Sequence, residues 1–149
     1  MNSWRNSTPI EIQADLDTLL DMAIKFCQDE LAKRGSFAPV AFAFSREASD
    51  PGATALAVDS NLSSTGEEHD QLRQQLLNSI DDWRSFSIAV DVGISEADFS
   101  DAIRVELVSP QGGVALYVLL PYRISPKDRN IEFGDLAATS GDTQFWLND

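Results

Sequence analysis

The chain has 149 residues, of which 43% are apolar and 23% charged, a composition typical of one globular domain (residues 1–149) and not of a disordered segment. Its 24 acidic and 11 basic residues give a formal net charge of −13, so we expect neither direct nucleic-acid binding nor binding to anionic membranes. No apolar run approaches the roughly 20 residues of a membrane helix, and the N-terminus lacks the basic start and apolar stretch of a secretory signal.

A long helix is predicted near the N-terminus. Thr8-Pro9-Ile10-Glu11 combines a hydroxyl N-cap, a proline at the first helical position and a glutamate at the third, which is a capping box. Apolar residues then recur at helical spacing as far as Leu31, and Gly35 marks the end of the helix. Cys27 lies near this apolar stripe. A single cysteine excludes an internal disulfide, so we expect a reduced, cytoplasmic protein.

Two strands and a second helix follow. Residues 36–45 and 54–59 contain side chains that alternate in size, on either side of the turn Asp50-Pro51-Gly52, which predicts a hairpin. A second capping box, Thr65-Gly66-Glu67-Glu68, predicts a helix whose apolar stripe runs from Leu72 to Trp83.

The rest of the chain is predicted to be strands, at 85–94, 102–108 and 114–122, with short ones around Ile131–Phe133 and Gln144–Leu147. The order is therefore α-β-β-α-β-β-β. Runs of strands joined by short turns favour an α+β fold, with an antiparallel sheet of about five to seven strands. We expect both helices to pack on one face of this sheet.

Alternation within the strands sorts the side chains into two faces. One face is large and apolar and is predicted to be the core: Val40, Phe42, Phe44, Leu56, Val58, Phe86, Ile88, Val90, Ile103, Val105, Leu107, Leu116, Val118 and Leu120. The other is small and mixed: Ala41, Ala43, Ala55, Ala57, Ser87, Ala89, Asp91, Arg104, Glu106, Ala115, Tyr117 and Leu119. This second face can be exposed, can seat a partner chain, or can form a shallow ligand surface.

The candidate binding residues lie on the second face, in the hairpin of residues 101–123. The turn SPQGG and the pairing of core residues across it place Glu106 near Tyr117, and Arg104 near Leu119. Arg104, Glu106 and Tyr117 are therefore predicted to form one short polar patch that is a candidate for binding.

No pattern points to catalysis. His69 is the single histidine, and no GxSxG stretch, phosphate-binding loop or calcium loop occurs. Asp17 and Asp21 share a helix face, where two carboxylates are far more often solvated than bound to a metal. We predict no catalytic residue, no metal site and no cofactor, and favour a non-enzymatic protein over an enzyme.

The chain resembles a group of short bacterial proteins over most of its length. Members pair a G-x-F-x-P segment with a DAI-x-V-x-L … LPY segment, matched here by Gly35, Phe37 and Pro39, and by Asp101–Val105 with Leu120–Tyr122. The group has no assigned activity, so the resemblance implies no catalytic residue. It implies a bacterial, cytoplasmic, single-domain protein.

Three functions are compatible with these observations. The favoured one is a non-enzymatic interaction protein that forms a homo-oligomer, as a dimer for example, through its small sheet face or an edge strand. An acidic immunity-like or nucleic-acid-mimic protein, with a basic protein partner, is the second. The third is a small-molecule-binding domain or weak enzyme that uses Arg104, Glu106 and Tyr117.

Overall fold

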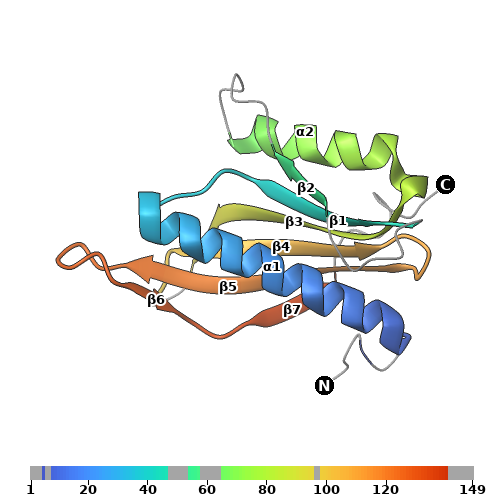
Figure 1. The fold of residues 1–149 in the computed structure, drawn as a ribbon. Coiled ribbons are helices and arrows are strands. Elements are labelled where there is room, and N and C mark those ends of the chain that lie inside the picture. Colours follow the sequence, from blue (N-terminus) through green and yellow to red (C-terminus); the bar gives the residue numbers. More distant parts are fainter. Residues whose placement is uncertain (1–4, 6–7, 47–53, 58–64, 96–97, 141–149) are drawn as a thin grey trace.

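A computed structural model of the chain describes residues 5, 8–46, 54–57, 65–95 and 98–140. The fold is α+β: the described residues form an antiparallel seven-stranded sheet and two main helices, so the predicted fold class is confirmed. The elements are α1 (Ile10–Arg34), β1 (Val40–Ser45), β2 (Thr54–Ala57), α2 (Thr65–Asn78), the 3-10 helix η2 (Ile80–Asp82), β3 (Trp83–Gly93), β4 (Asp101–Ser109), β5 (Val114–Ile124), β6 (Ile131–Phe133) and β7 (Ala137–Ser140). Figure 1 shows α1 lying across the sheet.

Helix α1 is the longest helix and begins one residue later than predicted. Pro9 is the N-cap, and no side chain caps the helix, so the predicted N-cap role of Thr8 is wrong. Instead, the side-chain amide of Gln13 donates to the carbonyl oxygens of Thr8 and Arg5, at 2.7 and 2.9 Å, and so ties the preceding turn to the helix. Gly35 ends the helix with φ 75°, the left-handed conformation that glycine adopts without steric cost.

The strands are ordered β2-β1-β3-β4-β5-β6, and β7 pairs with β5 beside β6. Both predicted hairpins are present, as β1–β2 and β4–β5. The register of the second agrees with the prediction, because Glu106 pairs with Tyr117 and Arg104 pairs with Leu119. The turn Asp50-Pro51-Gly52, Val58 and the predicted strand Gln144–Leu147 lie outside the described residues.

The two helices pack on opposite faces of the sheet, so the prediction that both cover one face is wrong. Buried residues of α1, among them Leu16, Leu19 and Cys27, form one core cluster with the inward side chains of β1, β4 and β5. Leu72 and Leu76 of α2 form a second cluster on the other side, which includes Ala41 and Ala43. The small sheet face is therefore the seat of α2, because small side chains let a helix approach the strands closely.

The pairing register of β3 with β1 explains why the prediction of a single covered face was wrong. Ala43 of β1 pairs with Phe86, so the large side chains of β3 share a face with the alanines of β1. Phe86 and Ile88 consequently pack under α2, whereas Ala89 belongs to the α1 cluster. Trp83, predicted to close the second helix, instead begins β3 and packs against the α2 cluster.

The small side chains of β3 that face α1 let this helix lie close to the strand. Ser85, Ser87 and Asp91 lie on the same face of β3 as Ala89, because side chains two residues apart in a strand point to the same side. Ser85 and Ser87 are buried there. Within the described part of the chain, no helix is long and apolar enough to cross a membrane.

Candidate functional site

The structure brings the predicted binding residues together on the face covered by α2. Glu106 pairs across the strands with Ile88 on one side and Tyr117 on the other, and Ile88 belongs to the cluster beneath α2. The guanidinium of Arg104 lies 4.8 Å from the centre of the Tyr117 ring, a cation–π contact. Glu106 is buried, with 1% of its surface exposed, whereas Arg104 and Tyr117 are half-buried.

Helix α2 adds two residues that the sequence analysis did not place in this patch. Arg73 Nη2 lies 3.8 Å from Glu106 Oε2, so the two residues form an ion pair with little exposure to water. His69 lies one turn before Arg73, on the same side of the helix. We call the five residues His69, Arg73, Arg104, Glu106 and Tyr117 the α2 polar cluster.

The α2 polar cluster holds two arginines and one carboxylate, so positive charge is in excess. Burial, followed by the positive charges of Arg73 and Arg104, lowers the pKa of His69, while Asp70 acts in the opposite direction. The buried atoms His69 Nε2 and Arg104 Nε have no hydrogen-bond partner within the part of the chain that the structure describes. The polar contacts of this cluster can hold α2 against the sheet.

The stability of the protein is expected to fall in acid through His69. Its pKa is lowered in the folded state, so below about pH 6.5 the unfolded chain binds a proton that the folded chain does not. The loss of stability therefore grows as the pH falls from the pKa of His69 in the unfolded chain toward its lower pKa in the folded chain. Urea unfolding at pH 7.5, 6.5 and 5.5 checks this, because His69→Gln should lose less stability over that range than the wild-type chain. Parallel pH profiles for the two proteins would contradict the expectation.

Three other titratable groups lie on the opposite side, under α1: Tyr122, Asp91 and Cys27. Tyr122 donates a hydrogen bond of 2.8 Å to Asp91, and burial first, then this hydrogen bond, raises the pKa of Tyr122. Asp91 was predicted to lie on the same face as Glu106, but it lies on the opposite face, because it pairs with Ile103 in the register between β3 and β4. Burial, with Asp91 and Glu30 nearby, raises the pKa of Cys27 to about 12, so its thiol stays protonated at neutral pH.

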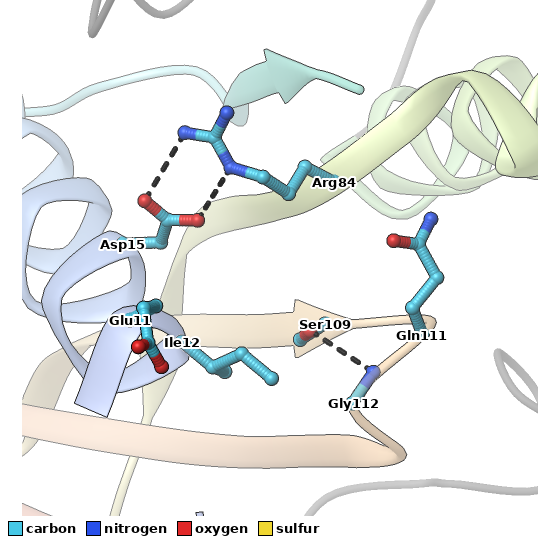
Figure 2. Close-up of a pocket in the computed structure, with 7 residues that line it drawn as sticks. All are labelled: Glu11, Ile12, Asp15, Arg84, Ser109, Gln111 and Gly112. Atoms are coloured by element: carbon cyan, nitrogen blue, oxygen red, sulfur yellow. Dashed lines mark hydrogen bonds and ion pairs between the residues drawn. The ribbon is translucent and has the colours of Figure 1, made fainter. Parts of the chain in front are cut away.

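A cavity of about 400 Å³ lies elsewhere, between the start of α1 and the β4–β5 turn. Figure 2 shows that α1 lines one side and the turn lines the other, with Arg84 reaching in from β3. Arg84 donates two hydrogen bonds to Asp15, of 2.6 and 3.1 Å. The lining residues are Glu11, Ile12, Asp15, Arg84, Ser109, Gln111 and Gly112.

Close packing at the turn shapes this cavity. The amide of Gly112 donates to Ser109 Oγ at 3.3 Å. A Cβ atom added at Gly112 would lie 2.5 Å from Ile12 Cδ1 and 2.9 Å from Ser109 Oγ, so a larger residue at this position would require these side chains to shift. Nothing local in the sequence signals that the start of α1 and the β4–β5 turn meet, so this cavity is not predictable from the chain.

The comparisons with known proteins add no relative. Neither family models, nor curated proteins, nor solved structures give a match to this chain. Among the described residues, no group of three or more histidine, cysteine, aspartate or glutamate side chains is arranged to hold a metal ion.

Proposed function

We propose that the protein is a non-enzymatic interaction protein that self-associates through the sheet edge formed by β6 and β7. The observation that carries this proposal is exposed apolar surface at that edge. Phe133 and Leu136 expose 37% and 54% of their surface, and they account for two of the four large apolar residues that are exposed in the described part of the chain. The other two, Ile10 and Phe26, lie on α1.

The edge also offers backbone groups for pairing. β6 and β7 both pair with β5, and in the described residues neither strand has a neighbour on its outer side. An open strand edge presents N–H and C=O groups that another antiparallel strand can pair with. Two copies related by a two-fold axis would join their sheets into one, with the same edge used by both.

Charge does not oppose association at this edge. Two copies of a chain with net charge −13 repel each other, so association is easiest where the local charge is lowest. Residues 123–140 carry three basic and three acidic side chains and are neutral as a segment: Arg123, Lys127 and Arg129 against Asp128, Glu132 and Asp135.

The small sheet face, the other route considered for self-association, is less suitable. Ala41 and Ala43 are fully buried, in the same cluster as Leu72 and Leu76 of α2. A second chain could reach these positions only if α2 moved away. The edge strand is therefore the better candidate.

Light scattering over a range of protein concentrations tests the proposal. The wild-type mass is expected to rise toward that of a dimer, and Leu136→Asp is expected to weaken association by at least about tenfold, because it places an unpaired charge in the interface. Ile10→Asp is the matched control: it adds the same charge at a residue that is 78% exposed on α1, and should associate like the wild type. A wild-type chain that stays monomeric at high concentration would refute the proposal.

The immunity-like alternative is less well supported. It requires a clustered acidic patch, but the acidic residues that the structure describes are distributed over α1, α2, η2, β3, β4, the β3–β4 connection and the segment after β5. Five of them also form ion pairs with arginines. A basic partner can still be accommodated at a local site.

A further inference from the structure

Helix α2 is held on the sheet by fewer buried apolar side chains than helix α1. Among the described residues of α2, Leu72 and Leu76 are fully buried, and Leu77 is partly buried beside them. On α1, the buried side chains are those of Leu16, Leu19, Ala23, Cys27 and Leu31. An element with little buried apolar surface opens at a lower free energy than the rest of a fold. We therefore expect α2 to leave the sheet more readily than α1.

His69 lies on the side of α2 that faces the sheet, together with Leu72 and Leu76. Its Nε2 atom is buried and has no hydrogen-bond partner within the described residues. A neutral imidazole can leave this nitrogen without a proton, whereas the imidazolium carries an N–H on both ring nitrogens. Protonation with α2 in place therefore creates a charged donor that has neither an acceptor nor water, which is unfavourable. Release of α2 removes this penalty, because it exposes the ring to water.

Positive charge prevails around His69. Arg73, one turn further along α2, and Arg104, on β4, both disfavour its protonation, whereas Asp70 favours it. Burial, followed by these two arginines, lowers the pKa of His69. The carboxylate of Glu106, the acidic member of the α2 polar cluster, lies 3.8 Å from Arg73 and forms an ion pair with it. A protonated His69 would add a third positive charge to two arginines and one carboxylate.

The other described neighbours of α2 do not compensate this charge. Tyr117 of β5 contacts Arg104 and is neutral at neutral pH. The strand β2 (Thr54–Ala57) contains no titratable residue. On β1 and β3, the side chains in the cluster beneath α2 are apolar: Ala41, Ala43, Phe86 and Ile88. Of the residues named here, only His69 is of a type that changes its charge between pH 5 and 8.

We propose that α2 is an acid-released cover of the sheet: protonation of His69 favours a state in which α2 has left the strands and the apolar face beneath it is accessible. The residues of that face are Ala41, Ala43, Phe86, Ile88, Val108 and Ala115. The α1 cluster lies on the opposite face and shares none of these residues, so the rest of the fold can persist while α2 is released. This device uses no residue of β6 or β7 and does not rest on the proposed self-association.

A single proton sets the size of the effect. Once α2 is released, the imidazole binds its proton with the ordinary pKa of about 6.5. One pH unit below this value, a proton bound only by the released state raises the opening constant of α2 about tenfold relative to neutral pH. Release is therefore expected to increase by at most about tenfold between pH 7.5 and pH 5.5.

Amide hydrogen exchange of the full chain, followed by NMR and expressed as protection factors, tests the proposal. The amides of Leu72 and Leu76 are expected to be at least about tenfold less protected than that of Leu19, because α2 opens without global unfolding. Between pH 7.5 and pH 5.5 the protection of Leu72 and Leu76 should fall about five- to tenfold. Equal protection of the two helices, or an unchanged protection of α2, overturns the proposal.

Variants identify the group that takes up the proton. In His69→Gln, which does not titrate, the protection of Leu76 is expected to change less than about twofold over the same pH range. Arg104→Gln should reduce the fall, because His69 then accepts its proton more easily with α2 in place. Arg34→Gln is the matched control: it removes the same charge from a side chain that is 73% exposed on α1, and should respond like the wild type. A fall that persists in His69→Gln, or that Arg34→Gln reduces as much as Arg104→Gln, overturns the proposal.

The imidazole itself gives a second measurement, which does not depend on the folding of a variant. His69 is the single histidine, so its ring proton signals in the NMR spectrum are unambiguous. In the wild-type chain these signals are expected to titrate with a midpoint below about pH 6.5. A midpoint at or above that value would show that the closed helix accepts the proton without penalty, which overturns the proposal.

Discussion

Replacing Ala43 by aspartate is expected to lower the free energy of unfolding by about 3–5 kcal/mol, because the new carboxylate is buried without a partner. Ala43 is 0% exposed and packs in the cluster beneath α2, with Phe86 opposite it on β3. A charged side chain there must either lose its water or push α2 off the sheet. Urea unfolding followed by circular dichroism measures the loss.

The matched control is Ala38→Asp, which adds the same charge just before β1. Ala38 is exposed, so this change is expected to alter the free energy of unfolding by no more than about 0.5 kcal/mol. If the two variants proved equally stable, α2 would not cover this face of the sheet. The pair therefore tests the helix arrangement directly, independently of any function.

Ala43 also illustrates which features of the fold could be predicted from the sequence and which could not. Alternation within each strand was predicted correctly, because it depends only on neighbours along the chain. Which strand faces share a side depends on the pairing register between strands, and for β1 and β3 no tight turn fixes it, because β2 and α2 lie between them in the chain. Taking the large side chains of both strands as one face led to a single core, where the structure has two.

Some residues of the α2 polar cluster could likewise be predicted from the sequence, and others could not. Glu106 and Tyr117 were paired correctly, since the tight turn between β4 and β5 fixes their register locally. The contributions of His69 and Arg73 depend on the packing of α2 against the sheet, which is not local. A signal was present, however: residues 69, 72, 73 and 76 share one helix face, so the buried leucines carry the two polar residues toward the sheet with them.

Replacing Arg73 by methionine is expected to lower the free energy of unfolding by about 3 kcal/mol, because it removes the ion pair that Arg73 forms with the buried Glu106 carboxylate. Glu106 is 1% exposed and Arg73 only 16%, so water cannot replace the lost contact. Arg34→Met is the control, since Arg34 is 73% exposed and lies 3.7 Å from Glu30. That exposed pair should contribute less than about 1 kcal/mol.

A second substitution separates loss of charge pairing from loss of packing. If the lost ion pair is the cause, the double variant Arg73→Met/Glu106→Leu should be more stable than Arg73→Met alone, because two apolar side chains then replace both members of the pair. A deficit that persists in the double variant would show that Arg73 acts through its aliphatic packing, and that the α2 polar cluster does not depend on its charges.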